Sequence, residues 1–207
     1  MHMDERVAKT MDNLRRHGFD VRFCETVEAA NQLIDSFVKP GAAVGFGGSM
    51  TIQEMKTADY LAPKAIEVID HNLPGLSAAE KAELRQRELS SDVFLTSSNA
   101  VTEDGQLYNV DGAGNRIAAM TFGPGKVIIV CGVNKIVPDL SAARERVRQV
   151  AAPLNNLRLA TGNPCIQAGH CVDCQAEGRI CRVTAIMDRK PMMTDITIIL
   201  VDQKLGY

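Results

Sequence analysis

The chain has 207 residues, a formal net charge of −2 at pH 7, and ordinary contents of apolar, charged and glycine residues. A chain of this length forms one domain that buries roughly 70% of its unfolded surface, so its core needs no disulfide bonds. The small negative charge, with no stripe of basic and aromatic residues, excludes nucleic acid as an expected partner. The charged amphipathic start and the lack of a long apolar run predict a cytoplasmic protein without membrane insertion.

Residues 1–40 predict a helical N-terminal extension that contains one strand. Apolar side chains recur at helical spacing over residues 4–17, which indicates an amphipathic helix. A short strand is expected over 20–25. A second helix is then expected over 26–38, where a threonine at the start provides a cap.

The segment from residue 41 to residue 89 alternates strands with a helix. The apolar run 42–46 follows a Lys-Pro-Gly break and predicts a buried strand, and 66–69 is another strand candidate. Ser77 and Glu80 have the spacing of a capping box, which predicts a helix that ends near Leu89.

Strands and tight turns dominate the middle of the chain. Short β-rich runs are separated by glycine-containing turns, which predicts two successive β-hairpins. The predicted strands cover residues 93–96, 100–102, 107–110 and 117–120.

The last third returns to an alternation of strand and helix. The continuous apolar run 126–131 is typical of a buried parallel strand, and 139–150 is its following helix. A cysteine-rich loop over 162–185 precedes the last strand, 196–201. We therefore predict a single α/β domain with an open, mostly parallel sheet, helices on both faces and an antiparallel hairpin excursion.

A glycine-rich loop lies where the first buried strand ends and a helix begins. It reads Gly45-Phe46-Gly47-Gly48-Ser49-Met50-Thr51. Backbone N–H groups and the hydroxyls of Ser49 and Thr51 can meet an anionic group at such a point. The alternative is a tight turn in which Ser49 only caps the helix. Glu54, one turn further on, faces either a ligand or water.

Glu103 and Asp111 are the candidate catalytic carboxylates. They flank two tight turns after a buried strand, so we expect them to converge near the glycine-rich loop. Paired carboxylates suit proton abstraction next to a carbonyl group. Asp104, which precedes Gly105, is explained by a hairpin turn alone.

Three further polar residues are candidates for ligand contacts. Lys135 follows the strand 126–131, where a lysine either neutralises a substrate carboxylate or phosphate, as a third catalytic candidate, or lies in solvent. Asn99 and Asn109 can donate hydrogen bonds to a hydroxy acid or sugar, or they can bond to their own backbone.

Four of the six cysteines form a cluster, which we call the cysteine quartet. Its spacing is C-x5-C-x2-C-x6-C, with Cys165, Cys171, Cys174 and Cys181 as members. Thiolate ligands recur at short intervals because they must converge on one point, whereas a buried core cysteine needs no such neighbours. The spacing is compatible with a [4Fe–4S] cluster, with zinc, or with free thiols or disulfides, and a reducing cytosol favours metal or redox chemistry.

Taken together, the glycine-rich loop and the segments 96–105, 109–116 and 132–137 resemble the LUD domain of lactate-utilisation proteins. The resemblance runs from about residue 41 to residue 207. It implies a fold similar to the glucosamine-phosphate isomerase, ribose-phosphate isomerase and CoA-transferase superfamily, with ligands at the glycine-rich loop. It also implies a role in oxidising lactate to pyruvate with iron–sulfur partner proteins. The cysteine quartet lies outside the central motifs of that domain.

Three functions remain open at this point. The first is lactate or organic-acid utilisation, with a small anionic metabolite bound where residues 45–54 face 99–111 and 134–135. The second is a stand-alone isomerase or acyl-transfer enzyme that acts on a phosphorylated or carboxylated metabolite. The third is a non-catalytic iron–sulfur redox or assembly subunit.

Overall fold

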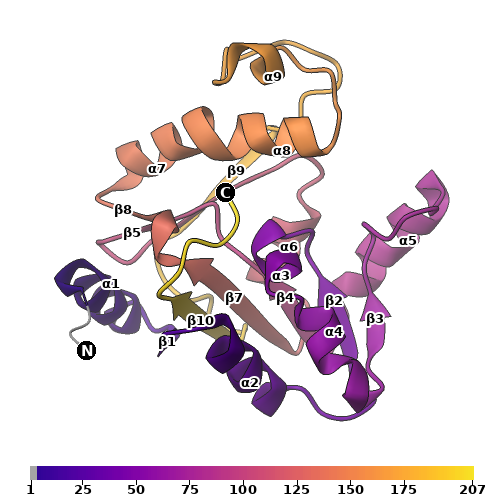
Figure 1. Cartoon of the computed structure of the whole chain (residues 1–207), viewed down its shortest axis with the longest axis vertical. Helices are drawn as coiled ribbons and strands as arrows, with labels where there is room; N and C mark the ends of the chain where they lie inside the picture. The colour runs from indigo at the N-terminus through magenta and orange to yellow at the C-terminus, as the bar shows by residue number, and fades with distance from the viewer. Residues whose placement is uncertain (1–3) are drawn as a thin grey trace.

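The computed structural model describes residues 4–207, which contain two β-sheets (Figure 1). The larger sheet has six strands in the order β1-β10-β7-β4-β2-β3, and all of its neighbouring strands run parallel. This confirms the predicted parallel α/β sheet. Its strands are β1 Asp20–Cys24, β2 Ala43–Phe46, β3 Glu67–Ile69, β4 Val93–Thr96, β7 Lys126–Gly132 and β10 Ile196–Val201.

The smaller sheet has four strands in the order β8-β5-β6-β9. Strands β5 and β6 form the predicted antiparallel hairpin, β8 pairs parallel with β5, and β9 pairs antiparallel with β6. Strand β9 was not predicted: its apolar residues lie within the cysteine-rich loop of the sequence, and only Met187 of its five residues is buried. The four strands are β5 Ala100–Thr102, β6 Leu107–Asp111, β8 Ile136–Val137 and β9 Val183–Met187.

Helices cover both faces of the larger sheet, as predicted. Helices α2, α3 and α4 pack on one face, while α1, α6 and the smaller sheet pack on the other. Helix α5 contacts β2, β3 and α6. The helices are α1 Glu5–Arg16, α2 Val27–Phe37, α3 Met50–Glu54, α4 Thr57–Leu61, α5 Ala78–Glu88, α6 Asn115–Thr121, α7 Leu140–Arg146, α8 Ala152–Arg158 and α9 Cys165–Ala168, with short 3-10 turns at Ala62–Lys64 and Val133–Lys135.

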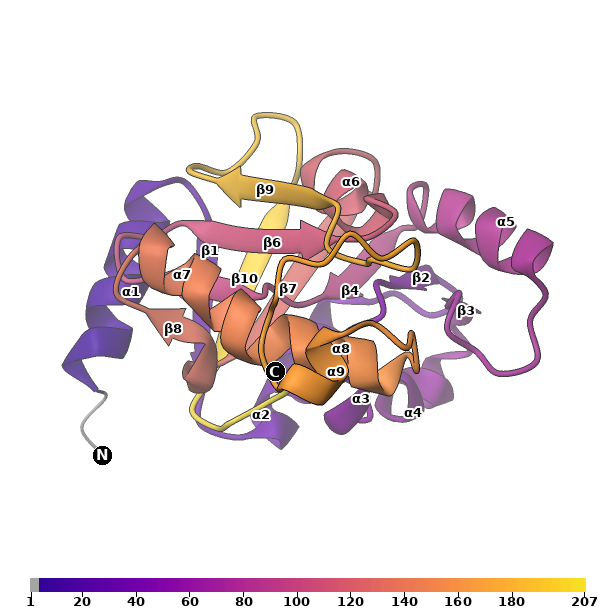
Figure 2. The same cartoon turned by 90° about the horizontal axis from the view of Figure 1, so that it is seen from above.

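An outer helical layer covers the far side of the smaller sheet. Helix α7, a π-helical turn at Val147–Ala151 and α8 run on from one another and bury the apolar side chains of β5, β6 and β8. Figure 2 shows this layer lying across the smaller sheet, and in Figure 1 the segment that contains α9 lies outermost. The helix predicted over 139–150 is therefore longer than expected, since it continues to Arg158.

The predicted second hairpin is wrong, because residues 117–120 belong to helix α6. Gly114 precedes the helix with a φ of +82°, a left-handed conformation that a glycine adopts without strain. The Asp111 carboxylate accepts a hydrogen bond from the backbone N–H of Ile117 in the first turn. A four-residue apolar run has no periodicity that distinguishes helix from strand, so these contacts decided the structure.

Residues 4–40 belong to the larger sheet and its helices, whereas the sequence predicted a separate extension. The expected strand is β1, which pairs with β10 at one edge of the larger sheet. The caps predicted for α2 and α5 are present: Thr26 accepts from the N–H of Ala29, and Ser77 and Glu80 form a capping box. Within residues 4–207 no helix has the length and apolar character needed to cross a bilayer.

Candidate functional site

A cavity of about 270 Å³ lies beyond the carboxyl ends of the parallel strands. Segments that follow β2, β3, β4 and β7 supply one side of it, while β6, α8 and the end of the cysteine-rich loop supply the other. Open α/β sheets bind ligands at this position, because the connections after neighbouring strands diverge there. The fold therefore places the predicted pocket between the larger sheet and the outer helical layer.

Lys135 lies at the wall of the cavity with only 3% of its surface exposed. Its ammonium group donates hydrogen bonds to Thr51 Oγ1 and Ser97 Oγ, each at 2.9 Å. Burial lowers the pKa of Lys135 to about 8, because the charged form loses its hydration. Among residues 4–207 no carboxylate forms an ion pair with it.

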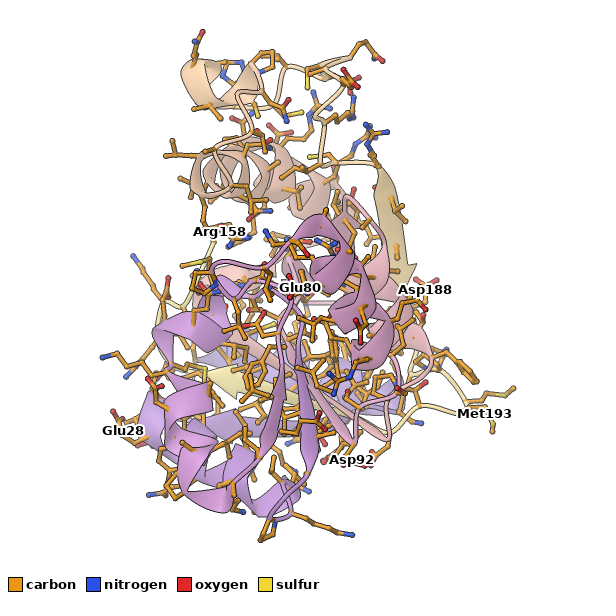
Figure 3. All side chains as sticks on the ribbon, turned by 90° about the vertical axis from the view of Figure 1, so that its right-hand side faces the viewer. Glu28, Glu80, Asp92, Arg158, Asp188 and Met193 are labelled. Carbon is orange, nitrogen blue, oxygen red and sulfur yellow. The ribbon has the colours of Figure 1, made fainter. Side chains whose placement is uncertain are left out.

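Two arginines add to the positive charge of the cavity. Arg158 donates to Asn155 Oδ1 and to the Tyr207 hydroxyl, and Figure 3 shows it on the inner side of α8. Arg85 from α5 also lines the cavity, and its buried Nε has no hydrogen-bond partner. Neither guanidinium pairs with a carboxylate in the part of the chain that the structure describes.

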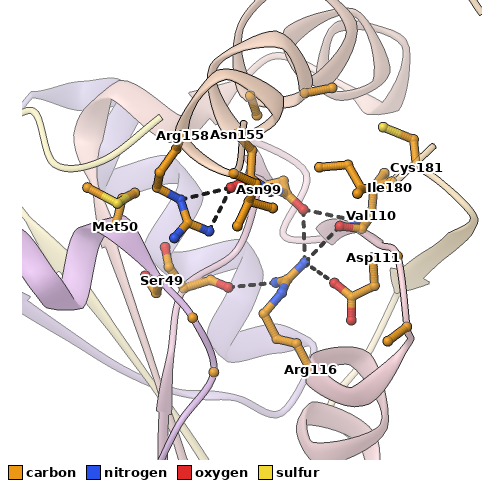
Figure 4. Close-up of a pocket in the computed structure, with 18 of the residues that line it drawn as sticks. Ser49, Met50, Asn99, Val110, Asp111, Arg116, Asn155, Arg158, Ile180 and Cys181 are labelled. Carbon is orange, nitrogen blue, oxygen red and sulfur yellow. Dashed lines mark hydrogen bonds and ion pairs between the residues drawn. The ribbon is translucent and has the colours of Figure 1, made fainter. Parts of the chain in front are cut away.

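The guanidinium of Arg116 is occupied by partners in the walls of the cavity and links them to one another (Figure 4). Its guanidinium pairs with Asp111 at 2.7 Å. It also donates to the side-chain oxygens of Asn99 and Asn109 and to the carbonyl oxygen of Ser97. Because Asp111 Oδ2 accepts from α6, both oxygens of this carboxylate are occupied. The predicted catalytic residue Asp111 does line the cavity, but its contacts are structural.

A buried histidine–glutamate pair was missed by the sequence analysis. His71 follows β3 and lines the cavity, and its Nδ1 lies 2.5 Å from Glu88 Oε1. We assign the Nδ1 proton to the ring, since Nδ1 faces a carboxylate, which leaves Nε2 as a proton acceptor. The position of His71 just after a predicted strand was a usable signal. Glu88 gave none, because its burial at 1% exposure arises only from tertiary packing.

The predicted convergence of Glu103 and Asp111 is not formed. Glu103 lies at the opposite end of the hairpin, where its carboxylate pairs with Arg6 and Lys9 of α1, each at 3.1 Å. It does not line the cavity. The hairpin explains the difference. Glu103 lies in the turn between β5 and β6, whereas Asp111 lies at the other end of β6.

The glycine-rich loop is only partly exposed to the cavity. Gly47, Gly48 and Ser49 line it, whereas Gly45 lies within β2 and packs closely against Ser91 and Phe94. Ser49 caps α3 by accepting from the N–H of Ile52, as the alternative explanation of the loop predicted.

The remaining predicted ligand contacts support the walls. Thr51 is fully buried and accepts from Lys135. Asn99 lines the cavity and accepts from the N–H of Val110, while Asn109 is buried behind it. Glu54 accepts from the N–H of Gly206 and so holds the C-terminal residues beside the site.

The cysteine quartet converges on a second, much smaller cavity of about 20 Å³. All four of its cysteines line this cavity. Cys165 begins α9, Cys171 and Cys174 lie in the loop after it, and Cys181 lies just before β9. Ala152, Ile180 and Cys181 line both cavities, so one member of the quartet, Cys181, forms part of the wall of the larger one. No described cysteine forms a disulfide.

Comparison with known proteins gives a family and solved structures of low sequence identity. The sequence profile of the LUD domain matches residues 7–201. A DUF162 family protein from Deinococcus radiodurans has a similar fold, with a TM-score of 0.54, 15% identity, and coverage of 97% of this chain and 99% of that one. Ribose 5-phosphate isomerase from Plasmodium falciparum aligns over 54% of this chain and 52% of its own, with 15% identity and a TM-score of 0.34. None of the curated proteins matches.

Proposed function

Because the chain belongs to the LUD domain family, which is associated with lactate utilisation, we propose that it takes part in lactate or organic-acid utilisation by binding a small carboxylate in the larger cavity. The observation that carries the proposal is the charge of the cavity. Lys135, Arg85 and Arg158 line it without ion-pair partners among residues 4–207. An uncompensated cation in a partly buried site favours an anionic ligand.

The size of the cavity supports a small ligand. Its volume of about 270 Å³ is slightly below the range typical of sites for drug-sized molecules. In the proposal Lys135 Nζ anchors the carboxylate of the ligand, since its two hydroxyl partners leave the third ammonium hydrogen for another acceptor. Arg158 and Arg85 hold the ligand from the opposite side.

His71 is the proposed proton acceptor. Oxidation of a 2-hydroxy acid to a 2-oxo acid removes two electrons and two protons from the hydroxyl-bearing carbon and its oxygen. His71 Nε2 would take the hydroxyl proton, and the Glu88 carboxylate would stabilise the imidazolium through Nδ1–H. The Cα hydrogen would leave with the two electrons as a hydride to a hydride-accepting cofactor of a partner protein, and that cofactor would pass the electrons one at a time to iron–sulfur partner proteins. Asp111 acts through Arg116, because it holds that guanidinium against the cavity wall.

The second candidate is an isomerase or acyl-transfer enzyme acting on a phosphorylated metabolite. The observation that favours it is the exposure of Gly48 and Ser49 to the same cavity as His71. A base beside an anion site suits proton abstraction next to a carbonyl as well as oxidation. Binding of inorganic phosphate therefore separates the two candidates.

Isothermal titration calorimetry of the full chain tests the proposal. L-lactate and pyruvate should bind, and lactamide, which has no charge, should not. Lys135→Met should weaken lactate binding by about tenfold or more, since a hydrogen bond to a charged group contributes about 1.5–3 kcal/mol. Lys39→Met is the matched control, because Lys39 is exposed and does not line the cavity.

Two results would count against this function. Equal affinity for lactate and lactamide would show that the cations do not select a carboxylate. Tight binding of inorganic phosphate, with no heat from lactate or pyruvate, would favour the phosphorylated-metabolite candidate instead.

A further inference from the structure

The cysteine quartet is preorganised as a ligand set, although the function proposed above makes no use of it. Its four cysteines span 17 positions of a loop and yet line one cavity of about 20 Å³. Cys165 is buried and the other three are partly exposed. A buried core cysteine needs no cysteine neighbours, so the lining of one small cavity by all four cysteines of this loop indicates a shared ligand. We propose that the cysteine quartet binds a [4Fe–4S] cluster, each thiolate ligating one iron.

Hydrogen bonds tie the loop to the outer helical layer and also join its two ends to each other. The N–H of Cys171 donates to the carbonyl oxygen of Arg148 at 2.7 Å. Further along, Asn163 Nδ2 donates to the carbonyl oxygen of Gly178 at 2.8 Å. The described cysteines form no disulfide, so these hydrogen bonds help to hold the loop in place.

The sulfur atoms of the quartet are not spaced as the ligands of a single zinc ion. Within residues 4–207 the only three ligand atoms of this kind that all lie within 4.8 Å of one another belong to Asp70, His71 and Glu88. No three thiols of the quartet are therefore that close. Tetrahedral zinc with Zn–S bonds of about 2.3 Å requires sulfurs about 3.8 Å apart. A cubane cluster needs wider spacing, because each cysteine binds a different iron.

The electrostatic surroundings suit an anionic group made of thiolates. Arg179 lines the small cavity and donates to the carbonyl oxygens of Cys174 and Cys181. The N–H of Asp173 donates to Cys171 Sγ at 3.4 Å, a type of bond that tunes iron–sulfur clusters.

Metal analysis of the full chain, purified without oxygen and reconstituted with iron and sulfide, tests the inference. We expect about four iron and four acid-labile sulfide per chain, with the visible absorption of a cluster and an electron paramagnetic resonance signal after reduction. Cys174→Ser should lose most of the iron. Cys24→Ser is the matched control, because Cys24 is a buried cysteine of β1 far from the loop in the sheet.

Each other outcome overturns the cluster. Zinc at one per chain with no iron would assign a zinc site, and a metal-free chain would leave four bare thiols. Iron retained by Cys174→Ser at the wild-type level would show that the quartet is not the ligand set. Far-UV circular dichroism and lactate calorimetry on Cys174→Ser separate cluster loss from unfolding, and Cys171→Ser provides a second variant of the same set.

A second consequence rests on the proposed function. Because Cys181 lines both cavities, a carboxylate bound in the larger one should shift the resonance spectrum of the reduced cluster. An unchanged spectrum under conditions where calorimetry shows binding would contradict this contact between the sites. Absence of calorimetric binding would instead count against the proposed function, while the metal analysis would still decide the cluster.

Discussion

At the scale of single residues, one buried amine dominates the candidate site. Lys135 donates hydrogen bonds only to the hydroxyl groups of Thr51 and Ser97, so no negative charge neutralises its ammonium group. Burying an ammonium group without a negative partner costs free energy, and an anionic ligand would supply that partner. The lowered pKa of Lys135, at about 8, follows from that cost and places its titration near neutral pH.

Carboxylate binding should weaken as the pH rises through the pKa of Lys135. The ammonium form binds the anion and predominates below pH 8, whereas the neutral amine predominates above it. The association constant for lactate should therefore fall about tenfold between about pH 7 and pH 9, in proportion to the protonated fraction. Calorimetry across this range measures the effect. Lys135→Met should bind weakly at every pH, and a wild-type affinity that rises with pH would contradict the assignment.

The buried pair of His71 and Glu88 leads to a separate expectation for turnover. His71→Gln should reduce the rate of hydroxy-acid oxidation by about 100-fold or more, the usual contribution of a positioned acid–base group. Lactate affinity should change little, because the carboxylate is held by Lys135. Steady-state kinetics with the iron–sulfur partner present measures both values. A rate equal to the wild type would remove His71 from the mechanism.

At the scale of elements, helix α6 determines the shape of the cavity. It supplies Arg116, which joins the ends of β4 and β6 through Ser97 and Asn109. It is held in turn by Asp111 through the N–H of Ile117. The element that the sequence analysis predicted as a strand is therefore the one that positions both walls of the site.

The two carboxylates predicted as a catalytic pair should differ sharply in their effect on stability. Asp111→Ala leaves Arg116 unpaired at a buried site, with side-chain exposures of 12% and 6%, and should cost about 3–5 kcal/mol of unfolding free energy. Glu103→Ala removes pairs with the half-exposed Arg6 and Lys9 and should cost about 0–1 kcal/mol. Urea unfolding followed by circular dichroism compares them. Similar losses for both variants would contradict this view of α6.

At the scale of the whole molecule, the candidate sites lie at the edges of three apolar cores. Two apolar cores on the faces of the larger sheet contain no member of the cysteine quartet, and a third core joins the smaller sheet to the outer helices. The smaller sheet lies between the larger sheet and the outer helical layer, so the larger cavity has walls from three layers (Figure 1).

Removal of metal should therefore loosen only the outermost segment. Anaerobic chelation of the reconstituted chain should speed amide hydrogen exchange in residues 163–182 and leave the exchange of β7 and β10 unchanged, since those strands are fully buried in the larger sheet. Mass spectrometry of peptides from both states measures the difference. Global loss of protection would show that the metal supports the whole fold.

The sequence by itself determined the parallel sheet, because strands such as 126–131 and 196–201 are apolar at nearly every position and must be buried on both faces. It also determined the caps of α2 and α5, which depend on residues three positions apart. Spacing alone identified the cysteine quartet, and position after a strand identified Lys135. These features are local, so neighbouring residues carry the information.

Only the tertiary structure decided which polar groups meet. Glu103 and Asp111 lie at opposite ends of a hairpin. Residues 117–120 belong to α6, and His71 pairs with Glu88 of α5. The tertiary structure also brought Cys181 to a wall shared by both cavities. Contacts between distant segments depend on how layers pack, and no local pattern of residue types records that packing.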